Sequence, residues 1–259
     1  MYRIVKLVTT LALLSFFALT GCEEIRVCTP GEGALETRTL NIDAFNGITL
    51  SSNAKVYLTQ DSVQSVTITA QSNLIDILKT DVSNQIWKID FEGCITDHED
   101  IEIYISAPDL RQVKISGAGD IIGQTPFDVA DMDLIISGSG DISMDLTAQH
   151  VLAKISGAGN IGLDLDVQSL ESKINGAGDL SFAGTALSHD ASISGSGNIS
   201  AFDLASDEVI VKVSGAGNTE VSVAQTLDVT ISGSGNVAYK GSPSLNLTVR
   251  GAGKVIDAN

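Results

Sequence analysis

A five-residue phrase recurs eight times between Ser116 and Lys254 and constrains the fold more than any other feature of the chain. The copies are SGAGD at 116–120, SGSGD at 137–141, SGAGN at 156–160, NGAGD at 175–179, SGSGN at 194–198, SGAGN at 214–218, SGSGN at 232–236 and RGAGK at 250–254. Their first glycines lie 18 to 21 residues apart. A fixed period this short indicates one small supersecondary unit stacked on copies of itself.

Apolar and polar residues alternate between the phrases, with the period of two that is typical of a strand buried on one face. After Asn160, for example, Ile161, Leu163 and Leu165 alternate with small or acidic residues. Each unit is therefore expected to hold two short strands, one entering and one leaving a glycine corner.

The composition of the corner has a physical interpretation. Glycine reaches positive φ without steric cost, so two glycines allow a sharp change of direction. Asp and Asn tolerate left-handed conformations and can bond back to the local backbone. The middle residue is always Ala or Ser, which predicts a confined position where larger side chains would meet their own copies.

Two architectures satisfy the pattern: a parallel β-helix with one unit per coil, and an antiparallel meander with the phrase as a hairpin loop. A meander needs an equally strong turn at the other end of each unit, where only variable segments such as AQH, VQS and VAQT occur. We therefore expect an all-β fold, a parallel β-helix solenoid with about nineteen residues per coil. Leucine-rich repeats lack the right consensus, and propeller blades are about twice as long.

The segment before the repeats is less regular. We divide the chain into a signal peptide (1–21), a tether (22–37), an N-terminal β-rich part (38–110) and the regular repeats (111–259). Strands are expected at 48–50, 55–59, 66–70, 85–91 and 101–106. Residues 73–80 can form one or two helical turns, with Asn73 as the N-cap.

The first residues have the form of an export signal. Arg3 and Lys6 precede an apolar run from Leu7 to Leu19, which is short for a membrane span. The tetrapeptide 19–22 (LTGC) resembles a bacterial lipobox, which implies lipidation of Cys22 and a chain held to a membrane by its acyl groups. An ordinary signal peptide, or a buried apolar helix that happens to end in Cys, is the alternative. We expect a lipoprotein of the cell envelope, at the outer membrane and either periplasmic or surface-exposed.

Two further cysteines, Cys28 and Cys94, would lie in an oxidising compartment after export and can form a disulfide, although sequence alone does not show that they meet. His98 stands among acids in TDHED at 96–100, where a metal site competes with a solvated turn; without a second His or Cys at ligand spacing we assign no metal. With 32 acidic against 15 basic residues, a nucleic-acid partner is not expected.

The chain also resembles a known family, the head GIN domain, an adhesin-like domain of unknown function in lipoproteins of Bacteroidetes-type bacteria. The residues that carry the likeness are FNGI at 45–48, VYLTQ at 56–60, NLI at 73–75, SAPDL at 106–110 and the SG[AS]G[DN] phrases, over residues 38–256. The resemblance implies a right-handed β-helix on an exported lipoprotein. It transfers no functional residues, and the last phrase departs from the pattern at Arg250 and Lys254.

Several functions compete. We expect a non-enzymatic binding or adhesion module with a surface protein or glycan as ligand, and no cofactor or catalytic residue, because the three histidines are scattered and no nucleophile motif accompanies them. A structural role in envelope assembly is the alternative. A glycan-active enzyme using paired carboxylates such as Asp164 and Asp166, and a calcium-binding β-roll using the Asp/Asn positions, are less favoured.

Overall fold

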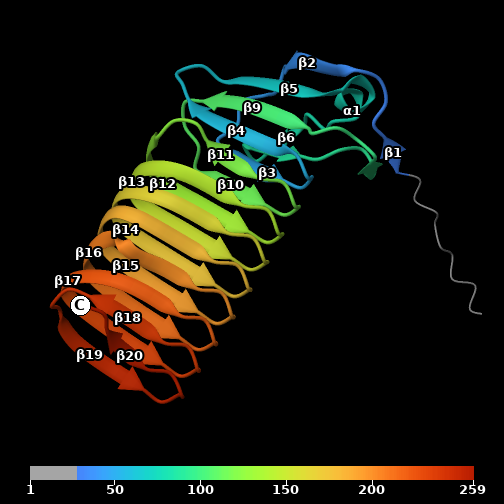
Figure 1. The fold of residues 1–259 in the computed structure, drawn as a ribbon. Coiled ribbons are helices and arrows are strands. Elements are labelled where there is room, and N and C mark those ends of the chain that lie inside the picture. The colour runs from blue at the N-terminus through green and yellow to red at the C-terminus, as the bar shows by residue number, and fades with distance from the viewer. Residues whose placement is uncertain (1–27) are drawn as a thin grey trace, which may run out of the picture.

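The structure is a computed structural model that describes residues 28–259, so the signal segment and Cys22 lie outside the described residues. It is an all-β solenoid of parallel coils, closed at its N-terminal end by antiparallel strands and one short helix within that range (Figure 1). The N-terminal elements are β1 (Thr29–Pro30), β2 (Leu35–Leu40), β3 (Gly47–Leu50), β4 (Lys55–Gln60), β5 (Ser65–Gln71), α1 (Ser72–Asp76), β6 (Val82–Ser83), β7 (Ile86–Ile89), β8 (Ile95–Thr96) and β9 (Glu102–Ala107). The coils comprise β10 (Gln112–Ile115), β11 (Ile121–Gly123), β12 (Phe127–Ile136), β13 (Ile142–Ile155), β14 (Ile161–Ile174), β15 (Leu180–Ile193), β16 (Ile199–Val213), β17 (Thr219–Ile231), β18 (Val237–Lys240), β19 (Ser244–Val249) and β20 (Val255–Asp257).

The coils stack in register with the period read from the sequence. Ile142 of β13 pairs with Ile161 of β14, which pairs with Leu180 of β15, and all these pairings are parallel. The predicted β-helix with about nineteen residues per coil is therefore confirmed. The alternating apolar residues of the coils from β10 to β18 point inward and belong to one continuous core.

Each coil from β13 to β17 contains one long bent strand rather than the two short strands expected. In β13 the alternation of buried and exposed residues is interrupted once, at Gln149 and His150, which are both exposed. This extra exposed residue shifts the alternation by one position, so both arms of the bent strand turn their apolar side to the same core. Register pairing resumes at His150, opposite Ser169, so the ladder continues through the bend.

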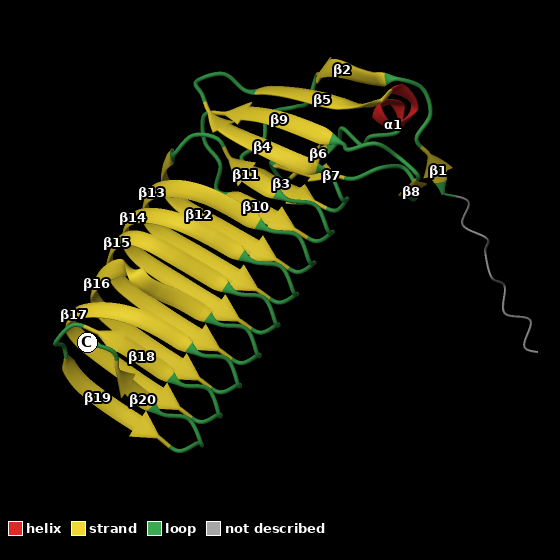
Figure 2. Ribbon diagram, in the orientation of Figure 1, coloured by secondary structure: helices red, strands yellow, loops and turns green. Residues whose placement is uncertain are grey.

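The glycine phrases form the corners at the other edge of the coil (Figure 2). Our prediction that their glycines supply positive φ is wrong: within residues 28–259, the positive-φ glycines are Gly33, Gly93, Gly184 and Gly241, none of them in a phrase. Glycine is needed because neighbouring coils approach closely. A Cβ atom on Gly157 would lie 1.9 Å from the carbonyl oxygen of Gly138. No side chain fits at that distance.

The middle residue of the phrase is not confined, contrary to expectation. Ala158 is exposed, as are its counterparts in the other phrases, whereas the second glycine is buried in every copy. The backbone N–H of Ala158 donates to the carbonyl oxygen of Gly138 at 3.0 Å. The steric restriction therefore acts on the glycines, and nothing in the structure explains the preference for Ala or Ser between them.

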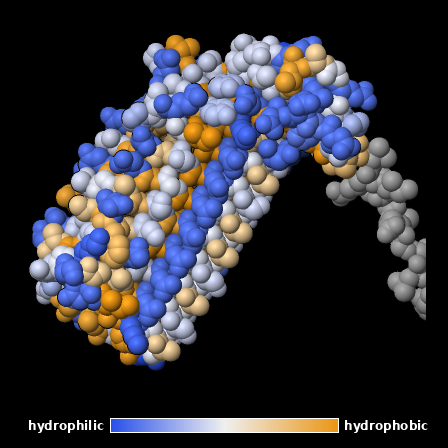
Figure 3. Space-filling view, in the orientation of Figure 1, coloured by the Kyte–Doolittle hydropathy of each residue, from blue (hydrophilic) through white to orange (hydrophobic). Residues whose placement is uncertain are grey.

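The Asp and Asn residues that end the phrases link successive coils. The carboxylate Oδ1 of Asp141 accepts hydrogen bonds from the backbone N–H of Asn160 at 2.7 Å and from its side-chain amide at 3.0 Å. The same arrangement joins Asp179 to Asn198. The expected bond to the local backbone is thus replaced by a bond to the next coil. Figure 3 shows a continuous hydrophilic stripe along the stack beside the corners, where this ladder runs.

The N-terminal part continues the stack before closing it. Strand β3 is parallel to both β10 and β7, and β4 is parallel to both β11 and β9. Strand β5 then pairs antiparallel with β9, and β2 pairs antiparallel with β5. On the outermost strand Arg38 forms ion pairs with Glu36 and Asp76. Such charges on an edge strand discourage pairing with another chain.

Helix α1 begins one residue earlier than predicted and is shorter. Its N-cap is Gln71, so the prediction of Asn73 as N-cap is wrong. The Asn73 side chain instead accepts from the N–H of Glu32 at 2.9 Å and donates to the carbonyl of Pro30 at 2.8 Å. These two bonds hold the segment after β1 against helix α1.

The opposite end of the solenoid is uncovered in the described chain. Leu245, Leu247 and Val249 of β19 occupy inward positions but are 42–46% exposed. Their register partners in β17, among them Leu227 and Ile231, are buried. Within residues 28–259, the first coils are thus capped by antiparallel strands, whereas no described element covers the inward positions of β19.

Candidate functional site

A groove runs along the bends, on the edge of the coils away from the glycine corners. Six successive strands line it, from β12 to β17, and its volume is about 880 Å³. Because adjacent strands lie about 4.8 Å apart, the groove extends roughly 24 Å across the six strands. We call it the bend groove; its sixteen lining residues are Asp128, Val129, Ala130, Thr147, Ala148, Gln149, Asp166, Val167, Gln168, Thr185, Ala186, Leu187, Ala205, Ser206, Asp207 and Ala224.

The floor of the bend groove is formed by residues with small apolar side chains. It consists of inward-facing residues at one register position, where Val129, Ala148, Val167 and Ala186 follow one another along the stack. These four side chains are 4–9% exposed. Because these side chains face the core, the floor on the outer surface is mainly the backbone of the bend, lying between two rows of outward-facing side chains.

Polar residues flank the floor on both sides. On one side Thr147, Asp166 and Thr185 are register partners, and the hydroxyl of Thr185 donates to Oδ1 of Asp166 at 2.9 Å. On the other side stand Gln149 and Gln168, both exposed. Strands β13 and β14 thus present hydrogen-bonding groups on both sides of the floor, whereas β12, β15 and β16 carry Ala130, Leu187 and Ala205 on one side.

The charge of the bend groove is negative. Its lining includes the carboxylates of Asp128, Asp166 and Asp207, and among the described residues no Lys or Arg lines it. Anionic ligands are therefore disfavoured there, because like charges repel and no basic group compensates them.

A second hollow of about 460 Å³ lies on the outer face of the first arm. It contains Asp145, Asp164, Asp203 and Glu220, with Lys240 at its border. Lys240 lies 4.3 Å from the ring centre of Phe202, which belongs to a bulge in β16 where the register with β17 shifts. Phe202 and Lys240 restrict this hollow at one end, so it is less continuous than the bend groove.

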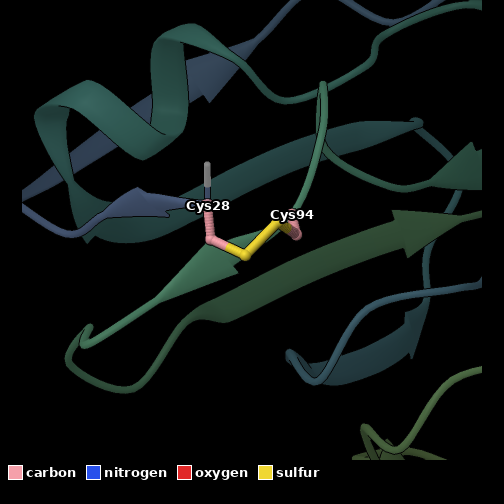
Figure 4. The surroundings of a disulfide bond; sticks show 2 residues. All are labelled: Cys28 and Cys94. Carbon is pink, nitrogen blue, oxygen red and sulfur yellow. A yellow bond between two sulfur atoms is a disulfide. The ribbon is translucent and has the colours of Figure 1, made fainter. Parts of the chain in front are cut away.

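The two cysteines that could pair do so in the structure. Cys28 and Cys94 form a disulfide that ties β1 to the segment before β8, with their Cα atoms 4.6 Å apart (Figure 4). The bond closes a loop between residues 66 positions apart. Its place on the cap, far in sequence from the bend groove, gives it a structural role.

The loop around His98 uses its imidazole for hydrogen bonds. Nδ1 lies 2.7 Å from the carbonyl oxygen of Glu99, and Nε2 lies 3.2 Å from the side-chain amide of Asn53. Within residues 28–259 no three His, Cys, Asp or Glu side chains are grouped as metal ligands. At the corners, the oxygens considered for calcium accept bonds from the next coil instead.

Of the residues that line the bend groove, only Asp166 is a candidate from the sequence, as one of a pair of carboxylates. The signal is visible in retrospect at Gln149 and His150, and again at Gln168 and Ser169: two successive non-apolar residues interrupt an alternating strand. Such an interruption marks a bend.

The chain matches the family described as "putative auto-transporter adhesin, head GIN domain" over residues 44–164 and 153–243. A putative adhesin from Parabacteroides merdae has a similar crystal structure, with 26% identity, a TM-score of 0.86, and coverage of 89% of this chain and 99% of the other. Two proteins from Parabacteroides distasonis share the fold: a putative adhesin (24% identity, TM-score 0.84, coverage 88% and 99%) and a putative lipid binding protein (21%, 0.80, 89% and 100%). No curated protein matches the sequence. Among the described residues, no helix has the length and apolarity needed to cross a bilayer.

Proposed function

The chain belongs to the head GIN domain family of putative auto-transporter adhesins, and from this we propose that it is a non-enzymatic binding module of the cell envelope. In this proposal the solenoid is held to the outer membrane by lipidated Cys22, and the bend groove is the surface that contacts the ligand. Its partner is a component outside the protein rather than a substrate that it converts.

The observation that carries the proposal is the form of the bend groove. The backbone bend recurs at one register position from β12 to β16, so the surface offers regularly spaced contacts along a line, with side chains that differ from coil to coil. A line of regularly spaced contacts suits an extended ligand bound at many points, whereas catalysis needs different groups converging on one bond. Polar groups on both sides of an apolar floor are typical of ligand sites.

The proposed anchor rests on residues 19–22 of the sequence. Acyl chains contribute about 0.8 kcal/mol per buried methylene, so a multiply acylated Cys22 would hold the chain on a membrane. We expect Cys22→Ser to move the protein from the membrane fraction to the soluble fraction of cells, and wild type to incorporate labelled palmitate. A variant that stays in the membrane fraction without label would disprove the anchor.

Adhesion requires exposure at the cell surface, whereas a structural role in envelope assembly does not. Protease added to intact cells should therefore remove the solenoid, and cells lacking the protein should adhere less to their normal surface. If the protein is cleaved only after the outer membrane is permeabilised, the adhesin proposal is wrong and the structural role replaces it.

A glycan-active enzyme remains the competitor to a binding module. We expect the purified protein, residues 28–259, to release no reducing ends or unsaturated products from neutral and acidic polysaccharides. Turnover that is lost on substituting Asp164 or Asp166 would contradict the proposal, since it would make these carboxylates catalytic.

A further inference from the structure

We propose that the bend groove binds a linear, uncharged glycan, with one sugar ring per coil. This inference rests on the proposed function, since it names the ligand class of the same surface. It is argued from the repeat distance, the polar flanks, the floor and the charge of the groove.

The repeat distance of the groove selects among extended polymers. Its contacts recur at the spacing of adjacent strands, about 4.8 Å. An extended peptide advances by about 3.3 Å per residue, so it cannot place one residue on each coil. A linear chain of pyranose rings advances per ring by nearly the coil spacing, so one ring can lie on each coil.

The polar flanks suit hydroxyl groups, which both donate and accept hydrogen bonds. Asp166 can only accept, while the amides of Gln149 and Gln168 can do both. Thr185 already donates to Asp166, which leaves the second carboxylate oxygen of Asp166 available and the Thr185 oxygen able to accept. A fatty acyl chain would leave these groups without partners on both sides of the floor.

The floor suits the C–H faces of sugar rings. The strip runs along the backbone at Val129, Ala148, Val167 and Ala186, whose apolar side chains are 4–9% exposed, and Leu187 adds an apolar side chain that is 60% exposed at its border. Among the described residues no aromatic ring lines the groove, so each sugar ring gains little by itself. Affinity must then come from several coils acting together on one chain.

The carboxylates of the groove determine which ligand charge it accepts. Asp128, Asp166 and Asp207 recur along the groove without basic residues among the described lining. Glycans that carry uronic acid, sulfate or phosphate would place like charges beside them at a free-energy cost. The groove therefore selects neutral sugars.

Binding of linear neutral oligosaccharides of increasing length tests the proposal. Purified residues 28–259 are titrated calorimetrically with β-1,4-linked glucan, mannan and xylan fragments, and with polygalacturonate fragments and palmitate as the competing classes. We expect one neutral series to bind, with affinity rising with length until about six rings, the number of strands that line the groove.

The double substitution Asp166→Ala/Gln168→Ala should weaken that binding by about tenfold, which corresponds to about 1.4 kcal/mol. The matched control Asp228→Ala/Thr230→Ala removes exposed polar groups on the second arm, outside the groove, and should bind as wild type does. Far-UV circular dichroism and melting temperature establish that both variants fold.

Three outcomes overturn the glycan assignment: no neutral series binds, polygalacturonate or palmitate binds instead, or the groove variant binds as tightly as the control. The first two would leave the proposed function standing if intact cells still lose adhesion on protease treatment, whereas the third would also remove the bend groove as the ligand surface. Conversely, glycan binding by a protein that is inaccessible at the cell surface would remove the adhesin role and retain the groove as a glycan site.

Discussion

His189 is a buried histidine that should make the solenoid lose stability in mild acid. It is 1% exposed, faces the core from β15, and occupies a position where its register partners are Leu170 and Val209. Its Nε2 atom lies 2.8 Å from the hydroxyl oxygen of Ser172, and its ring packs edge-on against Phe182. Its Nδ1 atom has no hydrogen-bond partner. Burial lowers the pKa of His189 to about 4 because the core disfavours the charged imidazolium.

The pH dependence follows from proton linkage. Above pH 6.5, the ordinary pKa of histidine, both the folded and the unfolded chain carry neutral imidazole, and His189 adds no pH dependence. Between about pH 6.5 and pH 4 the unfolded chain binds a proton that the folded chain does not. Stability then falls by about 1.4 kcal/mol per pH unit as the pH is lowered, to a total loss of about 3 kcal/mol near pH 4.

The double variant His189→Leu/Ser172→Ala isolates this effect. Leu restores the residue type of the neighbouring coils, and Ala matches Ala153 and Ala191, the register partners of Ser172. Replacing both partners leaves no orphaned hydroxyl and removes the unsatisfied Nδ1, so we expect a gain of about 1–3 kcal/mol at pH 7. At pH 4.5 the gain should be about 2.5 kcal/mol larger, since only wild type carries the buried titrating group.

Urea unfolding at pH 7, 6, 5 and 4.5 measures the difference between wild type and the variant. Circular dichroism follows the unfolding of the coils, and Trp87 fluorescence follows that of the N-terminal part. If the two unfolding curves coincide, the protein unfolds in a single cooperative transition. Surface carboxylates titrate equally in both proteins and cancel in the difference. His150→Gln, at an exposed position of β13, is the control and should leave the pH slope unchanged. A constant difference from pH 7 to pH 4.5 would refute the reasoning.

Three further predictions concern the packing of the coils and the cap. Gly157→Ala should destabilise the protein by several kcal/mol, because the added Cβ would lie 1.9 Å from a backbone oxygen. The control Ala158→Ser, at the exposed neighbouring position, should change the free energy of unfolding by less than about 0.5 kcal/mol. Equal effects of the two substitutions in a thermal melt would show that the glycines are not sterically required. Thr219→Val should stabilise the protein by about 1 kcal/mol in urea unfolding, because the buried Thr219 hydroxyl has no hydrogen-bond partner and its register neighbours are Ile199 and Val237. A loss of stability would mean that the hydroxyl does make a hydrogen bond. Cys28→Ser/Cys94→Ser should destabilise the cap by about 4 kcal/mol, given the separation of 66 residues, and unchanged Trp87 fluorescence transitions would contradict this.

The coil was predictable because two sequence signals agree. The period of the phrase gives the length of one turn, and the alternation from Ile161 to Val167 gives strands with a single buried face. The bend was not predictable in detail because a strand can change direction while its backbone pairing with the neighbouring strands continues. At Gln149 the backbone pairing is interrupted for one residue only, so the variable segments resembled turns although the strand passes through them.

The steric role of the repeated glycines was not predictable for a different reason. A glycine that is needed for positive φ and one that is needed for close approach look identical in a sequence. Gly184 and Gly241, which do have positive φ, lie in variable parts of their coils and carry no repeat signature. The repeated glycines mark contact between coils, which depends on the distance between two distant segments and only becomes visible once they are stacked.

The last phrase shows how the ladder ends. Each Asp or Asn accepts a hydrogen bond from the coil that follows, and Asn236 accepts from the N–H of Lys254 at 3.0 Å. Lys254 has no side-chain oxygen, so it completes the bond to the coil before it but offers nothing to a coil after it. The change from Asp or Asn to Lys therefore interrupts the stacking interaction at the same coil where the inward residues of β19, Leu245 to Val249, lose their cover. If the ladder bond directs stacking, Lys254→Asn should increase self-association of residues 28–259 in sedimentation experiments, because it restores an acceptor at the open end.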